Sequence, residues 1–232
     1  FAKQLASLGD IYVNDAFGAA HRAHASTEGI THHVSDSVAG YLMSKELQYL
    51  QEALAEPARP FVAILGGAKV VDKIEVIENL LDKVDTLLIG GGMAYTFLKA
   101  QGKEIGQSLL DEETVGTAAS LLKKAVEAGV DLQLPSDCVT VQKLEAGADQ
   151  QVVSTDAIPV DWEGVDIGPE TSAAFANLVS SAGTVVWNGP LGVFEIDDFA
   201  KGTNAVAQAL EQATWESGAV SIIGGGDTAS AL

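Results

Sequence analysis

Four short apolar runs each end in glycine, and this repeated pattern limits the possible fold more than any other feature of the chain. The runs span residues 61–65, 86–89, 184–187 and 220–223, and glycines follow at 66–67, 90–92, 189 and 224–226. Continuous β-branched and leucine-rich runs are typical of strands covered on both faces. Amphipathic segments at 73–84, 94–100 and 112–128 separate several of them, and this alternation favours parallel strands with right-handed crossovers. The sequence therefore predicts an α/β fold with a doubly wound, Rossmann-like parallel sheet.

A proline-containing break, Glu56-Pro57-Ala58-Arg59-Pro60, separates these strands from the first part of the chain. Before the break, the pattern predicts a helix over 2–8, a short strand over 11–13, a loop over 18–37 and a helix over 42–55. We expect two domains, residues 1–58 and residues 59–232. The chain opens on Phe1 inside a predicted helix and ends where a new helix begins, so we expect a piece of a larger protein.

Acidic residues greatly outnumber basic residues. The chain has 32 Asp and Glu against 13 Lys and Arg, which gives a formal net charge of −19. Such a surface repels phosphate backbones and anionic lipid, so we expect no nucleic-acid partner and no membrane partner. The single cysteine, Cys138, cannot form a disulfide within the chain, which is typical of the reducing cytoplasm.

The glycines predict a ligand site, because ligands of open parallel sheets bind at the carboxyl ends of the strands. Four glycine turns at one edge favour a nucleotide or phosphate ligand. The segment 66–69 departs from the P-loop pattern, whereas 224–229 matches the weak G-x-G-x-x-A dinucleotide pattern. Asp227 stands inside that match, and its carboxylate would repel phosphates unless a cation lies between them. We therefore expect phosphates complexed with Mg²⁺.

Two lysines and one acid are candidate ligand-binding residues. Lys69 and Lys73 are four residues apart near the predicted start of a helix, which would place both ammonium groups on one helix face. An anionic partner explains that arrangement, and solvated surface lysines are the alternative. Glu195 follows a predicted strand, and its carboxylate could accept hydrogen bonds from ribose hydroxyls. The alternative is an ordinary surface acid.

A further candidate lies in the first domain. Arg22 is one of two arginines in the chain and stands between His21 and His24, where its guanidinium could bind an anion. The two histidines could instead hold a metal ion, although no third ligand is evident at a usable spacing.

Together these motifs resemble the phosphoglycerate kinase family, in the same order and over the whole chain. The segments that carry the resemblance are 13–18, 20–26, 42–47, 60–70, 72–74, 90–97, 134–137, 166–170, 187–195 and 224–228.

The resemblance implies a two-domain kinase of glycolysis that catalyses reversible phosphoryl transfer between 1,3-bisphosphoglycerate and ADP, giving 3-phosphoglycerate and ATP. It places 3-phosphoglycerate on the N-terminal domain, with Arg22 as a binding residue. It implies that Lys69 and Gly226 act in catalysis and that Asp227 binds the Mg²⁺ of the nucleotide. The nucleotide-binding residues that it implies are Lys73, Gly168, Asn188, Pro190, Glu195, Gly225, Gly226, Asp227 and Thr228.

Departures from the family pattern qualify this expectation. Most of the N-terminal domain and the C-terminal end have no counterpart in the chain, so residues 1–58 would be a remnant with an interdomain helix. We expect this chain alone to be inactive and the whole enzyme to be a cytoplasmic monomer. Two alternatives are a NAD-dependent dehydrogenase and a non-catalytic nucleotide-binding module.

Overall fold

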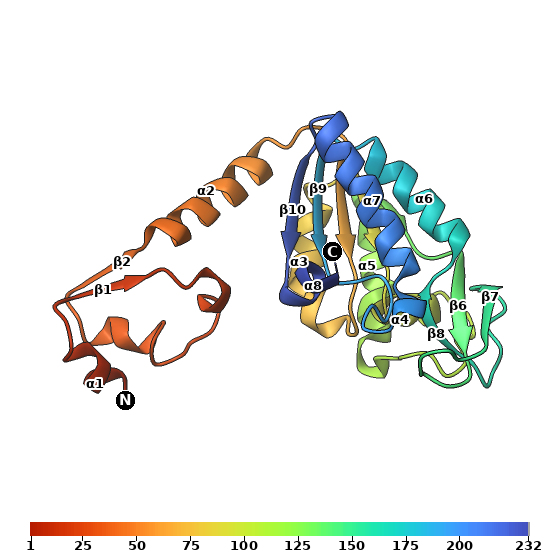
Figure 1. Ribbon diagram of the computed structural model, residues 1–232, viewed down its shortest axis with the longest axis horizontal. Helices are drawn as coiled ribbons and strands as arrows, with labels where there is room; N and C mark the ends of the chain where they lie inside the picture. Colours follow the sequence, from red (N-terminus) through yellow and green to blue (C-terminus); the bar gives the residue numbers. More distant parts are fainter. Residues whose placement is uncertain (232) are drawn as a thin grey trace. The chain divides into compact units, whose positions relative to one another are not determined.

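The computed structural model describes residues 1–231, apart from the side chains of residues 52 and 53 (Figure 1). The chain divides into two compact units, Phe1–Glu56 and Pro57–Leu232. The division falls within the proline-containing segment, two residues before the boundary expected from the sequence. In the described part of the chain, no helix combines the length and the apolar character needed to cross a membrane.

The first unit contains two parallel strands and two helices. Strand β1 pairs in parallel with β2, an element that the sequence did not predict. Short 3-10 helices occupy part of the connection that we expected to be a loop. The bounds are α1 Ala2–Ala6, β1 Ile11–Asn14, β2 Asp36–Ala39 and α2 Tyr41–Ala55.

A five-stranded parallel sheet forms the centre of the second unit, with the order β10-β9-β3-β4-β5. The α/β fold with a parallel sheet is confirmed. Chain order runs outward from β3 through β4 to β5 and, on the other side, from β9 to β10, so the order reverses between β3 and β9. Such a reversal is where ligands of doubly wound folds bind. The bounds are β3 Phe61–Leu65, β4 Thr86–Ile89, β5 Asp131–Gln133, β9 Thr184–Asn188 and β10 Val220–Gly224.

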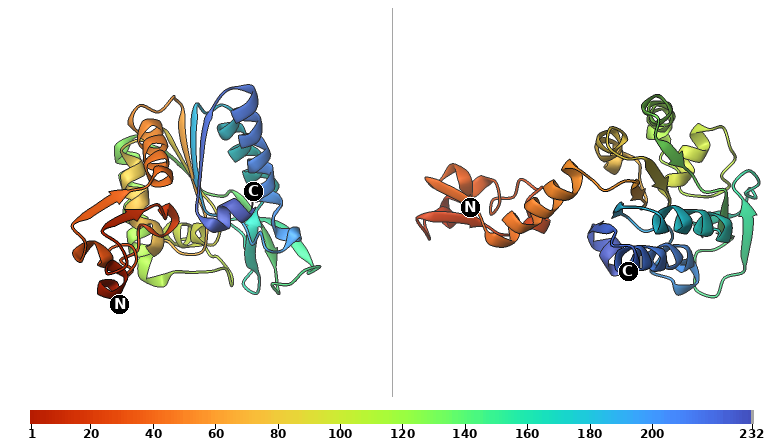
Figure 2. Two further views of the ribbon diagram at one scale, coloured as in Figure 1. Left: turned by 60° about the vertical axis from the view of Figure 1, so that its left-hand side comes forward. Right: turned by 90° about the horizontal axis from the view of Figure 1, so that it is seen from above.

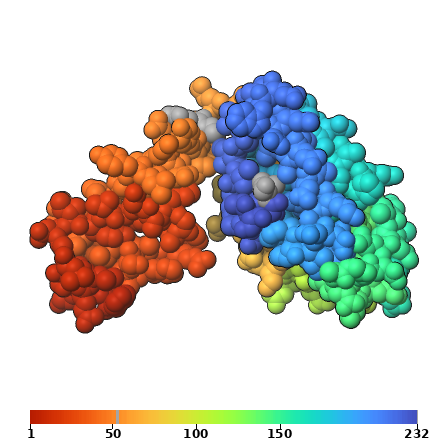
Figure 3. Space-filling model, viewed as in Figure 1, coloured from red at the N-terminus to blue at the C-terminus, as the bar shows by residue number. Residues whose placement is uncertain are grey.

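Helices cover both faces of this sheet. On one face lie α6 and α7, and on the other lie α3, α4 and α5 (Figure 2). The blue α7 and β10 form part of the face of this unit seen in Figure 3. The bounds are α3 Ile74–Leu81, α4 Met93–Ala100, α5 Val115–Ala128, α6 Pro169–Ser180, α7 Lys201–Glu216 and α8 Gly226–Ala231, which follows β10.

The helix ends follow local rules of backbone conformation. Pro169 occupies the first turn of α6, where its fixed φ suits a helix and its missing N–H leaves no bond unmade. Gly129 ends α5 with a φ of 72°, a left-handed conformation that glycine adopts without strain.

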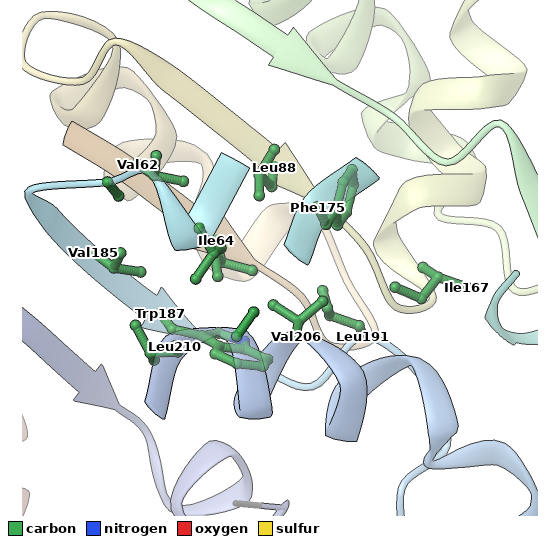
Figure 4. Packing of buried hydrophobic residues seen from close by; sticks show 13 residues of the cluster. Val62, Ile64, Leu88, Ile167, Phe175, Val185, Trp187, Leu191, Val206 and Leu210 are labelled. Carbon is green, nitrogen blue, oxygen red and sulfur yellow. The ribbon is translucent and has the colours of Figure 1, made fainter. Parts of the chain in front are cut away.

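The largest core cluster lies between the sheet and the helices α6 and α7. Trp187 of β9 is fully buried and lies with Phe175 of α6 and Leu210 of α7 in this cluster (Figure 4). Its indole N–H donates to the Gly189 carbonyl oxygen at 2.7 Å. The core therefore fixes the strand end that precedes one of the glycine turns.

A second, antiparallel sheet with the order β7-β6-β8 was absent from the sequence prediction. Its outer strand β7 is mostly exposed and polar, so no apolar run marks it. The ranges of α6 and α7 were also not predicted. The bounds are β6 Asp137–Val141, β7 Gln150–Ser154 and β8 Glu163–Ile167.

Candidate nucleotide site

The four glycine turns lie in one row, because the strands that they follow (β10, β9, β3 and β4) are neighbours in the sheet. Each turn contains one glycine with a positive φ: Gly67 at 96°, Gly91 at 63°, Gly189 at 99° and Gly225 at 90°. Residues with a Cβ rarely adopt this conformation. The backbone conformation therefore favours glycine in each of the four turns, and the strand order places these turns side by side.

Backbone packs directly against backbone where the central turns meet. The N–H groups of Gly67 and Gly91 donate to the carbonyl oxygens of Pro190 and Leu191, each at 3.0 Å. A Cβ added at Gly66 would lie 2.0 Å from the Pro190 carbonyl oxygen, so no larger residue fits there. These contacts join the turn after β3 to the loop after β9, across the point where the strand order reverses.

A cavity of about 350 Å³ opens beside this edge. Glycines 67, 91 and 92 line it together with the β8 segment 163–167 and the loop 190–195. Of the site residues predicted from the sequence, Pro190, Glu195 and Asp227 line the cavity. Its volume and its mixed apolar and polar lining suit a small organic ligand.

Lys73 lies next to this cavity and is held in place. Its Nζ donates to Asn188 Oδ1 at 2.5 Å, across 115 residues of sequence. Partial burial lowers the pKa of the Lys73 ammonium, while the nearby carboxylates of Asp72 and Asp227 act in the opposite direction. The side chains of three residues therefore lie close together at the edge of the sheet that carries the glycine turns: Lys73, Asn188 and Asp227.

Lys69 requires a correction to the sequence interpretation. Helix α3 begins at Ile74 and follows a short 3-10 helix over Val71–Lys73. Lys69 precedes both helices and is exposed, so the two ammonium groups do not share a helix face. Lys69 instead follows Ala68, which lines the cavity.

Thr228 faces into the protein. Its side chain is buried, and its Oγ1 accepts the N–H of Gly189 at 2.7 Å. This bond joins α8, which begins at Gly226, to the loop after β9. A Cβ at Gly225 would lie 3.4 Å from Asn188 Oδ1 and 3.5 Å from Thr228 Oγ1, which are ordinary contact distances, so the positive φ of Gly225 favours glycine there more than lack of space does.

Gly168 lies on another segment of the second unit, and Arg22 belongs to the first unit. Gly168 is the residue before α6 and is buried against the carboxyl group of Asp137. It follows Ile167, which lines the cavity. Arg22 belongs to the first unit, is exposed, and donates from Nε to His21 Nε2 at 3.3 Å.

Asp227 is an exposed carboxylate in the first turn of α8. Among the described residues, no group of three or more His, Cys, Asp or Glu side chains could hold a metal ion. A cation at Asp227 would therefore take most of its ligands from elsewhere. That donor set fits Mg²⁺, which keeps several waters and is commonly bound by one or two carboxylates plus phosphate oxygens.

Several cavity-lining side chains had no assigned role in the sequence analysis, among them Tyr95, Cys138 and Asp166. Burial raises the pKa of the Cys138 thiol to about 12, so the thiol stays protonated. Burial also raises the pKa of the Asp166 carboxyl to about 7, against the opposing effect of two backbone N–H groups and Lys201. The only sequence signal for Asp166 was its place in the segment 166–170.

The fold and the row of glycine turns define a doubly wound α/β protein. Proteins of this class bind phosphorylated ligands at the carboxyl ends of the strands, where the strand order reverses. The chain belongs to the phosphoglycerate kinase family, whose family model matches residues 1–232. It is 59% identical over 232 residues to the phosphoglycerate kinase of Chloroherpeton thalassium and 56% identical to that of Moorella thermoacetica. In both comparisons the whole chain is covered, and it spans 58% of the relative's length.

Solved structures agree with this assignment. The phosphoglycerate kinase of Coxiella burnetii superposes with a TM-score of 0.88 at 49% identity, covering 100% of this chain and 58% of that one. The enzyme of Pyrococcus horikoshii gives a TM-score of 0.76 at 29% identity, covering 99% and 57%. The resemblance read from the motifs is thereby confirmed.

Proposed function

We propose that this chain carries the nucleotide-binding half of phosphoglycerate kinase. The reaction is reversible phosphoryl transfer between 1,3-bisphosphoglycerate and ADP, giving 3-phosphoglycerate and ATP in glycolysis. One observation carries the proposal: four glycine turns lie in a row on neighbouring strands, with Lys73, Asn188 and Asp227 gathered at the same edge. Family membership favours this activity over that of a NAD-dependent dehydrogenase.

Phosphoryl transfer depends mainly on how the two substrates are positioned and on neutralisation of the phosphate charge, because the protein forms no covalent bond to the phosphoryl group. Backbone N–H groups of Gly225 and Gly226 would bind the nucleotide phosphates. Asn188 holds the Lys73 ammonium at this edge, where it would bind the same phosphates. Asp227 would hold the Mg²⁺ of the nucleotide, and that cation neutralises phosphate charge when bound.

Lys69 would contact the phosphoryl group while it is being transferred. It is exposed beside the cavity-lining Ala68, and its ammonium would stabilise the equatorial oxygens. The Glu195 carboxylate would accept hydrogen bonds from the ribose hydroxyls. The walls around the nucleotide would be shaped by Pro190, Thr228 and Gly168. Arg22 of the first unit would bind the acid substrate, and water would have to be excluded from the phosphoryl group during transfer.

Other properties of the whole enzyme belong to the proposal as well. We propose a cytoplasmic, Mg²⁺-dependent monomer. The single cysteine supports a reducing compartment. For this chain by itself, we propose that it binds nucleotide without turnover.

The metal role of Asp227 can be tested by calorimetry with ADP, with and without Mg²⁺. We expect Mg²⁺ to tighten ADP binding to the 232-residue chain by about 10-fold, and Asp227→Asn to remove that gain, because one charge-assisted contact is lost. Asp82→Asn is the control, since Asp82 is an exposed carboxylate that ends α3 outside the cavity. Equal losses with and without Mg²⁺ would exclude Asp227 as the metal ligand, and a folded chain without ADP binding would contradict the proposed function.

A further inference from the structure

Asp166 is a buried acid in the cavity wall to which the reaction gives no role. It lies on β8, is 2% exposed, and accepts two backbone N–H groups. Its Oδ1 accepts from Ile167 at 2.9 Å, and its Oδ2 accepts from Gly202, in the first turn of α7, at 2.7 Å. Burying a carboxylate is unfavourable, so its presence in a cavity wall calls for an explanation.

Two glycines leave room for this carboxylate. A Cβ added at Gly192 would lie 2.2 Å from Asp166 Oδ1, and one at Gly202 would lie 2.6 Å from the same oxygen. Both distances are far below a normal contact, so a side chain at either position would displace the acid. The carboxylate is therefore in direct contact with two other segments, the loop after β9 and the start of α7.

These contacts join three segments of the second unit: β8, the loop after β9 and the start of α7. The N–H of Val193 donates to the Val165 carbonyl oxygen at 2.8 Å, next to Asp166 on β8. Glu195 lies three residues after Gly192, and Gly168 lies two residues after Asp166. The wall between them is lined by apolar groups, including Val165, Ile167, Leu191 and Phe194, which suits a flat heterocyclic base.

We propose that Asp166 is a positioning residue for the base and ribose of the nucleotide: its carboxylate holds the loop 192–195 and the backbone 167–168 at the spacing that this half of the ligand requires. The inference rests on the proposed function, which supplies the nucleotide. The hydrogen-bond donors to this carboxylate, Ile167 and Gly202, belong to β8 and α7, whereas the turns that would bind the phosphates follow β3, β4 and β10. Loss of the carboxylate should therefore weaken binding of the nucleoside part and leave the phosphate contacts intact.

The experiment compares Asp166→Asn and Asp166→Ala in the full-length protein by calorimetry with MgADP and with Mg-pyrophosphate, and by steady-state kinetics. Loss of a residue that orients metal ligands typically weakens a metal site by about 10–100-fold, and we use that range by analogy. We expect a loss of that size for MgADP with Asp166→Ala, a smaller loss with Asp166→Asn, which retains one acceptor, and unchanged pyrophosphate affinity. The KM for MgADP should rise while kcat changes little.

Two further variants separate positioning from general damage. Gly202→Ala places a Cβ 2.3 Å from Ile167 Cγ1 and 2.6 Å from Asp166 Oδ1, so it displaces the carboxylate and the neighbouring Ile167 without removing either. It should reproduce the selective loss, which keeps the test decisive if the Asp166 variants fail to fold. Asp85→Asn is the matched control, because Asp85 also accepts a backbone N–H, that of Phe61 at 2.6 Å, at the opposite end of β3. It should leave MgADP affinity unchanged.

Equal losses of MgADP and pyrophosphate affinity would overturn the inference, as would unchanged MgADP affinity in both Asp166→Ala and Gly202→Ala. A wild-type protein that binds pyrophosphate but not MgADP would overturn the proposed function and the inference together. Wild-type binding with unaffected variants would overturn the inference alone.

Discussion

At the scale of single residues, the two lysines near the first glycine turn occupy different environments. Lys73 is partly buried and bonded to Asn188, whereas Lys69 is exposed in the preceding turn. A group held among fixed partners is suited to bind phosphate in the ground state. An exposed ammonium can instead meet charge that develops during transfer. The positions therefore suggest separate contributions to affinity and to rate.

Kinetics of the two alanine variants of the full-length protein would measure this separation. Lys69→Ala should lower kcat and kcat/KM together by about 10²–10³, by analogy with the loss of an oxyanion-stabilising donor. Lys73→Ala should mainly raise the KM for the nucleotide. Lys83→Ala serves as the control, since Lys83 is an exposed lysine just after α3. Near-normal kcat in Lys69→Ala would remove that residue from the catalytic step.

At the scale of elements, α8 is joined to the loop after β9 by one buried hydrogen bond, between Thr228 Oγ1 and the Gly189 N–H. Thr228→Val keeps the shape of the side chain but leaves this N–H without its acceptor. We expect the free energy of unfolding to fall by about 1–3 kcal/mol, the usual effect of an unsatisfied buried donor. Urea denaturation measures the change, with Ser230→Ala as the control because Ser230 is exposed on the same helix. Equal stability of the two variants would mean that the bond contributes nothing.

At the scale of the whole molecule, the two units differ in how well their strands are covered. In the first unit, Ile11, Val13 and Val38 on β1 and β2 are each more than half exposed. In the second unit, every residue of β3 and β4 is buried. Burial of apolar side chains therefore contributes little to the stability of β1 and β2. Isolated pairs of strands are only marginally stable in water.

Hydrogen exchange of the 232-residue chain would detect this difference. The amides of β1 and β2 should exchange at least about 100-fold faster than those of β3 and β9, since local opening needs less free energy where few apolar contacts are lost. The edge strand β10 gives an internal comparison, because it belongs to the large sheet yet exposes Val220 and Ile223. Equal protection of β1 and β3 would contradict the argument.

Local chemistry explains how much of this protein could be predicted from its sequence. Apolar runs and the glycines behind them predict strands and turns from neighbouring residues, and the edge of the sheet that carries the site follows from strand direction. In the structure, Pro169 and Gly129 mark helix ends for the same kind of reason, although the range of α6 was not predicted. Glu195 and Asp227 were candidates because of their places after these turns, whereas the roles of the other candidates in 188–195 and 224–228 came from the family resemblance. These features depend on backbone sterics and periodicity, which a few consecutive residues encode.

Only the tertiary structure decided which of these pieces meet. The pairing of β9 with β3, the bond between Lys73 and Asn188 across 115 residues, and the inward hydroxyl of Thr228 each depend on distant parts of the chain. The antiparallel sheet and the place of Asp166 between Gly192 and Gly202 depend on them as well. Such contacts form because the packing of the whole core selects one arrangement among many that share the same local preferences. The sequence by itself determined the strands of the parallel sheet, the glycine turns that follow them and the edge that carries the site, and the packing determined the walls of the site.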